Sequence, residues 1–155
     1  MNILAIEDSR FLRTAIERSL MKAGYSVTTT ANGQEGLEIA RTCSPGLILL
    51  DMMLPGIDGT RVLEALKQDP ATKKIPVIVL SGLSQRNEAK MKRAGAAAYI
   101  EKSALNLEGN ADALVRLVRE ALGEGYPTVY GAGGQRGPAA PGDRKSEVAS
   151  GKDRQ

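Results

Sequence analysis

The sequence predicts an α/β fold in which a parallel sheet carries helices on both faces. Short apolar runs alternate five times with segments whose apolar residues recur at helical spacing, and parallel strands need such crossover connections. The runs Leu47–Leu50 and Val77–Leu80 are apolar throughout, which is typical of strands buried on both faces. A chain of 155 residues, 42% of them hydrophobic and 25% charged, fits one globular domain.

Five short runs rich in β-forming residues are the predicted strands. Each run is only three to five residues long and is bounded by polar, Gly or Pro residues, as strands of a compact sheet usually are. In chain order the predicted strands are Asn2–Ile6, Ser26–Thr30, Leu47–Leu50, Val77–Leu80 and Ala98–Ile100.

The segments between these strands carry apolar stripes that predict five helices. Gly24 and Gly95 follow the first and fourth stripes, as glycine often does at helix C-caps, and the third stripe stops before Pro70. The stripes are Phe11, Leu12, Ala15, Ile16 and Leu20; Leu37, Ile39 and Ala40; Val62, Leu63 and Leu66; Glu88–Ala94; and Leu114, Leu117, Val118, Ala121 and Leu122.

The composition changes after Leu122. Residues 123–155 hold eight Gly and three Pro, and no Leu, Ile, Phe or Met, so they bury too little apolar surface to offset the entropy of ordering them. We therefore expect a domain over residues 1–122 and a disordered Gly/Pro-rich tail over 123–155. The tail is either an inert flexible end or a partner-docking segment around Tyr126–Tyr130.

Several chemistries are excluded by composition. The chain has no His, so it holds no Ser-His-Asp triad, no HExxH zinc site and no phosphohistidine of its own. A single Cys43 forms no internal disulfide and suits a reducing compartment. Glu7 and Asp8 stand where a signal peptide needs apolar residues, and no run approaches the roughly 20 residues of a membrane span. We expect a cytoplasmic protein without membrane insertion.

The net charge of +3 is small, and the basic residues are spread along the chain. Direct nucleic-acid binding is therefore not expected, since that function usually needs a concentrated basic patch.

Polar residues that suit phosphoryl transfer follow the predicted strands. Ligands of open α/β sheets bind at the carboxyl ends of the strands, where this chain places Glu7 and Asp8, then Asp51, then Ser81, then Lys102. Three carboxylates on one rim repel one another unless a cation lies among them, and Mg²⁺ prefers such oxygen ligands. A metal, a lysine and a hydroxyl together stabilise a transferring phosphoryl group.

Asp51 is the best nucleophile of this set because it ends the central strand, and its product would be an aspartyl phosphate. Each residue also has an ordinary structural interpretation. Asp8 or Ser9 can cap the first helix, Asp51 can belong to a turn, and Lys102 can be a surface lysine. Their placement at successive strand ends favours the functional interpretation.

These residues carry a resemblance to a known family. The segments ILAIEDS, LILLDMMLPGIDG, IPVIVLSG and GAAAYIEKS resemble those of a response-regulator receiver domain of the CheY type, over about Asn2 to Leu122. The resemblance implies a flavodoxin-like sheet with strand order 2-1-3-4-5. It also implies a two-component signalling protein that catalyses only its own phosphorylation and dephosphorylation.

The resemblance assigns a role to each site residue. Asp51 would accept the phosphoryl group from a sensor histidine kinase, a phosphotransfer protein or acetyl phosphate. Mg²⁺ would be held by Asp8, Asp51, Glu7 and the backbone carbonyl of Met53. Lys102 and Ser81 would contact the phosphoryl group, and Tyr99 would be the aromatic switch. The signal would pass to a downstream protein through the face formed by the fourth helix, fifth strand and fifth helix.

The chain departs from the family pattern in three places. Ser103 replaces the Pro that often follows the lysine, so a cis bond is not expected there. The stretch Ala104–Asn110 is long and polar for a connection, which leaves the start of the fifth helix open. Met53 and Leu83 are apolar at positions that flank the phosphoryl group, and such side chains orient no attacking water. We therefore predict slow self-dephosphorylation.

The sequence leaves three alternatives to a stand-alone phosphorylated receiver. The chain can be a phosphorylation-independent interaction module that keeps the fold, or the receiver part of a longer regulator. A haloacid-dehalogenase type of phosphatase is disfavoured, because Asp51 is followed by Met52 and Met53, which supply no acid/base partner.

Overall fold

The protein forms a five-stranded parallel sheet with strand order β2-β1-β3-β4-β5, which confirms the predicted fold class and order. The computed structural model describes residues 1–82, 88–105 and 112–124. The strands are β1 (Asn2–Ile6), β2 (Ser26–Thr30), β3 (Leu47–Asp51), β4 (Val77–Ser81) and β5 (Ala98–Glu101).

Three strands extend one residue beyond the predicted ends, to Asp51, Ser81 and Glu101. These polar residues still pair in the ladder, with Asp51 opposite Leu80 and Ser81 opposite Glu101. The prediction stopped early because it followed side-chain polarity, whereas strand pairing is made by the backbone. As a result, the polar side chains stand on the rigid end of the sheet.

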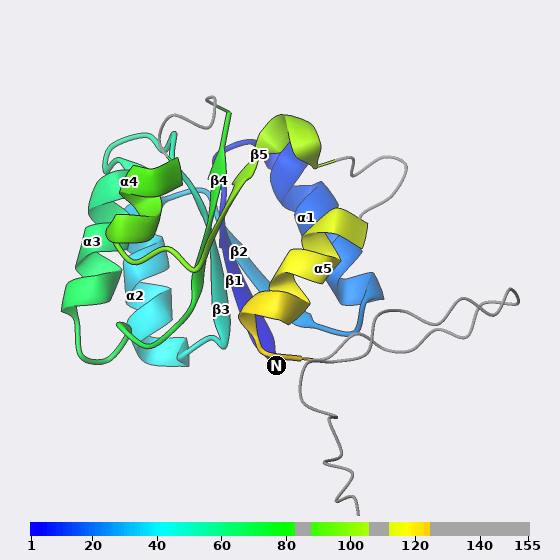
Figure 1. Ribbon diagram of the computed structural model, residues 1–155, viewed down its shortest axis with the longest axis horizontal. Helices are drawn as coiled ribbons and strands as arrows, with labels where there is room; N and C mark the ends of the chain where they lie inside the picture. Colours follow the sequence, from blue (N-terminus) through cyan, green and yellow to red (C-terminus); the bar gives the residue numbers. More distant parts are fainter. Residues whose placement is uncertain (83–87, 106–111, 125–155) are drawn as a thin grey trace, which may run out of the picture.

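The helices cover both faces of the sheet, as predicted. Figure 1 shows α2, α3 and α4 on one side, and α1 and α5 on the other. No helix in the described part of the chain is long and apolar enough to cross a membrane. The helices are α1 (Arg10–Lys22), α2 (Gly33–Cys43), α3 (Gly59–Gln68), α4 (Glu88–Arg93) and α5 (Asp112–Ala121), with a 3₁₀ turn, η2 (Lys102–Ala104), after β5.

Two apolar cores lie on the two faces, because successive side chains of a strand point to opposite sides. Leu4 and Ile48 face α2, α3 and α4, where they join Leu66. Ile3 and Leu47 face α1 and α5. The strands β3 and β4 are buried at every position, as their apolar runs predicted.

Helix boundaries follow local signals in the sequence. The Ser9 hydroxyl accepts a hydrogen bond from the Leu12 amide (3.3 Å) and caps α1, which selects Ser9 from the two predicted candidates. Gly24 and Gly95 take positive φ angles of 99° and 105° after α1 and α4, as expected for glycine at a helix end. No cis peptide occurs between described residues, so the bond between Lys102 and Ser103 is trans.

Two sequence predictions lie largely outside the described residues. The open question about Ala104–Asn110 concerns residues of which only Ala104 and Leu105 are described. The tail prediction concerns residues 123–155, of which Gly123 and Glu124 are described. Both stay predictions.

Candidate phosphoryl-transfer site

Asp51 ends the central strand β3, between β1 and β4. The residue is 1% exposed, and its Oδ1 accepts a hydrogen bond from the Met53 amide (3.0 Å). The carboxylate is therefore held in one orientation at the rim of the sheet, with few competing contacts to water.

Lys102 joins two carboxylates at this rim. Its Nζ lies 3.0 Å from Asp51 Oδ1 and 3.2 Å from Glu7 Oε1. Glu7 is 1% exposed, whereas the Lys102 side chain is 23% exposed. Lys102 follows the edge strand β5, so its long side chain reaches across β4 to the ends of β3 and β1. The predicted meeting of Glu7, Asp51 and Lys102 is present in the fold.

Burial raises the pKa of Glu7 from 4.5 to about 6, because the charged form loses water. The Ser9 amide, which donates to Glu7 Oε1 at 3.0 Å, and the Lys102 ammonium lower that pKa. The neighbouring Asp51 carboxylate raises it. Burial lowers the pKa of Lys102, but its contacts with Asp51 and Glu7 outweigh burial and raise it overall. Lys102 therefore stays charged between the two carboxylates.

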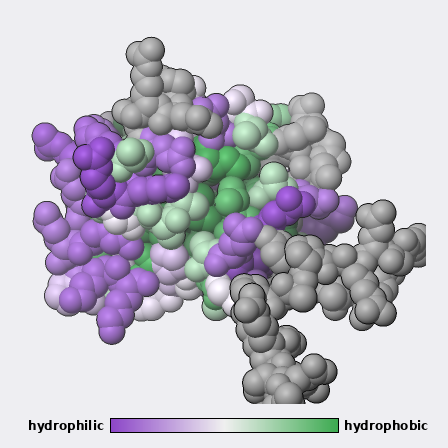
Figure 2. Space-filling view, in the orientation of Figure 1, coloured by the Kyte–Doolittle hydropathy of each residue, from purple (hydrophilic) through white to green (hydrophobic). Residues whose placement is uncertain are grey.

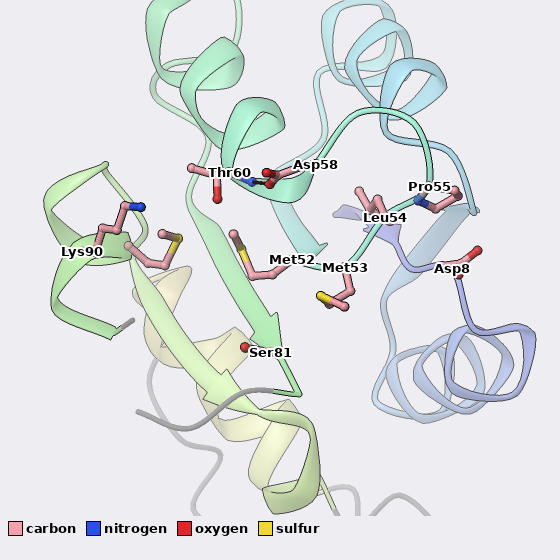
Figure 3. Close-up of a pocket in the computed structure, with 10 residues that line it drawn as sticks. Asp8, Met52, Met53, Leu54, Pro55, Asp58, Thr60, Ser81 and Lys90 are labelled. Carbon is pink, nitrogen blue, oxygen red and sulfur yellow. Dashed lines mark hydrogen bonds between the residues drawn. The ribbon is translucent and has the colours of Figure 1, made fainter. Parts of the chain in front are cut away.

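Asp8 lies on the same rim but is exposed. Its backbone carbonyl, like that of Glu7, accepts a hydrogen bond from Arg13 Nη1, at 3.3 Å and 3.0 Å respectively. In Figure 3, Asp8 stands on the loop after β1, across the pocket from Lys90 and Thr60. Asp8 is thus at the predicted edge, and its loop is tied back to α1.

An open pocket of about 520 Å³ lies beside these residues. Figure 3 shows Ser81 at the end of β4, with Met52 and Met53 beside it. Ser81 is 1% exposed, so only a small part of it reaches the pocket. The pocket is lined by Asp8, Met52, Met53, Leu54, Pro55, Asp58, Thr60, Ser81, Lys90 and Met91.

Tyr99 lies on β5, opposite Val79 of β4. It is partly buried and packs against the core under α4, which includes Met91. Since Met91 also lines the pocket that Ser81 lines, the core that includes Tyr99 borders this pocket.

The oxygen donors at this edge suit a small hard cation. Glu7 Oε2 is buried and has no hydrogen-bond partner among the described groups, so a cation at that oxygen would satisfy it. Within the described ranges, no three acidic, His or Cys side chains already converge as a complete metal site, so an ion here would take part of its coordination from a backbone carbonyl and from water. Mg²⁺ fits such a sparse donor set because it usually keeps several of its waters.

Sequence reasoning missed Arg13 and Gly59, which support the site from behind. Arg13 follows the acidic pair by five residues, and one helical turn returns its side chain toward that loop. Gly59 begins α3 and packs against the backbone of Asp51 and Met52, and its amide donates to the Met52 carbonyl (3.2 Å). Motifs at strand ends point to neither residue, because both act through the backbone.

Gly59→Ala is expected to destabilise the protein. The added methyl would collide with the Asp51 carbonyl and lie 2.6 Å from Met52 Cα, and backbone atoms cannot turn aside. We expect the free energy of unfolding, measured by urea denaturation, to fall by about 1–3 kcal/mol. Gly82→Ala is the matched control, because no described atom lies within 4 Å of its added methyl. Equal stability of the two variants would contradict the close packing of α3 on β3.

The chain is similar to known proteins in both sequence and structure. A family model described as the response regulator receiver domain matches residues 3–109. The Streptomyces coelicolor transcriptional regulatory protein AfsQ1 is 44% identical over 80 residues, which make up 52% of this chain and 34% of AfsQ1. The chain therefore spans about a third of that relative.

The polar-differentiation response regulator DivK of Brucella anthropi is 36% identical over 103 residues, which make up 65% of this chain and 83% of DivK. Among solved structures, the receiver domain of the Pseudomonas aeruginosa sensor histidine kinase PA1611 superposes with a TM-score of 0.69 at 26% identity. The match covers 79% of this chain and 98% of that one, whose structure has a magnesium ion coordinated in the active-site cleft.

Proposed function

Because this chain belongs to the response regulator receiver family, we propose that it takes a phosphoryl group onto Asp51 from a histidine kinase or a phosphotransfer protein. Its family acts in phosphorylation-based two-component signalling. The observation that best supports Asp51 is the contact of Lys102 Nζ with a buried carboxylate at the end of the central strand, 3.0 Å away. A cation fixed at that distance offsets the charge that the phosphoryl group brings.

The transfer is a displacement at phosphorus. An oxygen of Asp51 forms the new O–P bond while the P–N bond to the donor histidine, or the P–O bond of an acyl phosphate, breaks with the electron pair going to the donor. Met53 N–H and Lys102 both donate to Oδ1, so we assign the attack to Oδ2. Lys102 and the Ser81 hydroxyl then hold phosphoryl oxygens. The chain itself catalyses nothing beyond its own phosphorylation and dephosphorylation.

We assign the magnesium ligands to Glu7, Asp8, Asp51 and the Met53 carbonyl, with Glu7 acting partly through water. When bound, Mg²⁺ would neutralise charge on the phosphoryl oxygens during transfer. The buried, unpartnered Glu7 Oε2 supports a cation at this edge. So does the magnesium ion in the active-site cleft of the PA1611 receiver domain.

Phosphorylation would be read out through Ser81 and Tyr99. The phosphoryl group adds about −1.5 to −2 charge and three acceptor oxygens, which would draw the Ser81 hydroxyl toward Asp51. The pocket between Ser81 and Met91 offers space for the Tyr99 ring, which already packs against the same core. One local electrostatic change would thus alter the surface formed by α4, β5 and α5.

We place the downstream protein partner on that surface. In Figure 2, hydrophobic residues lie at the edge of the sheet between the two helical layers, beside hydrophilic residues over α3 and α4. The last turn of α4 carries Lys90, Lys92 and Arg93, so a partner with acidic residues around an apolar centre would complement this surface. We expect this exchange to occur in the cytoplasm, without direct nucleic-acid contact.

The test is intact-protein mass spectrometry after incubation with acetyl phosphate and Mg²⁺. We expect a gain of one phosphoryl group that disappears when Mg²⁺ is chelated. No gain from acetyl phosphate or from a panel of phosphorylated histidine kinases, with the protein folded, would favour a phosphorylation-independent interaction module. A longer gene product containing this sequence would instead identify it as the receiver part of a larger regulator.

The phosphorylated protein is expected to lose its phosphoryl group slowly. The Met53 side chain is 64% exposed and lines the pocket with Asp8 and Ser81, where its thioether orients no attacking water. Leu83, the second predicted residue, lies outside the described residues. Met53→Asn supplies an amide that can hold a water, so we expect the lifetime of the phosphorylated form to shorten by roughly threefold to tenfold.

The lifetime is measured by following the phosphorylated mass after the donor is removed. Met53→Leu is the matched control and should leave the lifetime unchanged, because it keeps an apolar side chain of similar size. A wild-type lifetime of seconds that Met53→Asn does not alter would contradict the role of Met53.

A further inference from the structure

We propose that Arg13 is a positioning residue that aims Asp8 toward the magnesium site by holding the backbone of the acidic loop. This inference rests on the proposed function, because it concerns how the chain binds Mg²⁺. Arg13 is absent from the residues that the strand-end pattern identifies, and it makes no contact with Asp51 among the described hydrogen bonds and ion pairs.

One guanidinium nitrogen of Arg13 donates hydrogen bonds to two backbone carbonyls. Arg13 Nη1 donates to the carbonyl oxygens of Glu7 (3.0 Å) and Asp8 (3.3 Å), the two residues whose carboxylates are assigned to the ion. The Arg13 side chain is partly buried. A donor that bridges the carbonyls of Glu7 and Asp8 restrains the backbone dihedral angles of Asp8. These angles determine the direction of the Asp8 side chain.

Asp8 needs such support more than Glu7 does. Glu7 is held at two points. Its backbone amide donates to the Thr30 carbonyl (3.0 Å), and its carboxylate accepts a hydrogen bond from the Ser9 amide and pairs with Lys102. Asp8 is exposed, and among described residues its carboxylate makes no hydrogen bond or ion pair. The restraint on Asp8 therefore comes through its backbone, and Arg13 provides a large part of it.

The position of Arg13 in its helix supports a role beyond helix stability. It is the fourth residue of α1, close to the helix N-terminus, where a positive charge opposes the helix dipole. An arginine placed there costs the helix a little stability, so its two backbone contacts are the better explanation for its side-chain position.

Two possible roles of Arg13, as a nearby positive charge or as a residue that orders the loop, predict opposite changes in Mg²⁺ affinity when it is replaced. If Arg13 acted only as a nearby positive charge, its removal would strengthen the binding of a divalent cation. If it orders the loop, its removal weakens binding, because Asp8 must then be ordered when the ion binds. Loss of a group that orients metal ligands commonly weakens affinity by about 10-fold or more.

The experiment is a Mg²⁺ titration of the full chain, followed by NMR at the backbone amides of residues 6–9 and 51–53. We expect Arg13→Met to raise the Kd by roughly 10-fold and Arg13→Lys, which keeps one charged donor, to recover part of the loss. Arg10→Met is the matched control, since Arg10 is an exposed residue of the same helix turn and its removal changes the net charge equally. It should leave the Kd within twofold or lower it slightly.

A second readout needs no metal. Hydrogen exchange of the Ser9 amide, which Glu7 Oε1 protects, should become faster in Arg13→Met at unchanged melting temperature. A Kd that stays equal or falls in Arg13→Met, while wild type binds Mg²⁺, would overturn the role of Arg13 and leave the proposed function intact. Failure of wild type itself to bind Mg²⁺ would overturn the proposed metal site and this inference with it.

Discussion

We expect Asp51→Asn to abolish the incorporation of a phosphoryl group from acetyl phosphate in the presence of Mg²⁺. An amide has no anionic oxygen to attack phosphorus, so the covalent step is lost rather than slowed. The fold should persist, because asparagine has the same shape and its side-chain oxygen still accepts the Met53 amide. Removing one of two adjacent buried charges also relieves repulsion with Glu7, so the melting temperature should stay equal or rise.

Asp58→Asn is the matched control for this loss. Asp58 lines the same pocket but caps α3 through the Thr60 amide (2.7 Å), and asparagine caps helices as well as aspartate does. We expect this variant to gain the phosphoryl mass as wild type does. Phosphorylation of Asp51→Asn at the wild-type level would show that another residue is the acceptor.

Lys102→Met should lower both phosphorylation and stability. Loss of a positive charge beside the transferring group commonly slows such a reaction by 10²-fold or more, and we expect at least roughly a tenfold fall in labelling by acetyl phosphate. Without metal, Glu7 and Asp51 lose the cation between them. Removing one partner of a buried pair costs roughly 3–5 kcal/mol, and we expect about 2 kcal/mol here because Lys102 keeps some contact with water.

The loss of stability in Lys102→Met should depend on pH. The pKa of Glu7 in the folded protein, about 6, lies above its ordinary value of 4.5, so Glu7 binds its proton more tightly when folded. Its contribution to stability is full at low pH and falls as pH rises through that range. Without the Lys102 charge this pKa rises further. The variant's deficit should therefore be small at low pH, where Glu7 is protonated in both proteins, and should grow as pH rises above about 6.

Urea denaturation in the presence of a chelator measures this effect, and added Mg²⁺ should restore part of the loss. Lys90→Met is the matched control, because Lys90 lines the same pocket while no ion pair within the described ranges joins it to Glu7 or Asp51. A Lys102→Met protein as stable as wild type at every pH would contradict the bridging role of Lys102.

The fold was predictable because the apolar runs and the residues that end helices indicate the same alternation of strands and helices. The apolar runs at Leu47–Leu50 and Val77–Leu80 indicate buried strands, and Gly24 and Gly95 mark helix ends where the structure has positive φ angles. The strand order does not follow from these patterns. It came from the resemblance, because several orders of five parallel strands bury the same runs equally well.

The sequence predicted which residues form the candidate site better than it predicted how their side chains are arranged. Because ligands of open α/β sheets bind at the carboxyl ends of the strands, the sequence predicted that Glu7, Asp51 and Lys102 lie at one site. The structure places Lys102 in contact with both carboxylates. The sequence pattern did not reveal that Lys102 bridges both carboxylates, because the reach of a long side chain across β4 depends on side-chain conformation. It also treated Glu7 and Asp8 alike, although one is buried and the other exposed.

The support of the site was the least predictable part. Gly59 matters because the backbone of Asp51 passes against it, and that contact joins α3 to β3 only after folding. Arg13 matters through two carbonyl groups, which every residue type has. Sequence patterns describe side chains, so contacts made to the backbone of a distant segment leave little trace in them.

The most direct test of the central claim is to locate the phosphoryl group. The protein is phosphorylated with acetyl phosphate and Mg²⁺, treated with borohydride, which reduces an aspartyl phosphate to homoserine, and then digested and sequenced by tandem mass spectrometry. We predict homoserine at position 51 and at no other acidic residue, including Asp8 and Asp58. Homoserine at a different position, with Asp51 unmodified in a protein that gained the phosphoryl mass, would contradict the assignment of Asp51 as the phosphoacceptor.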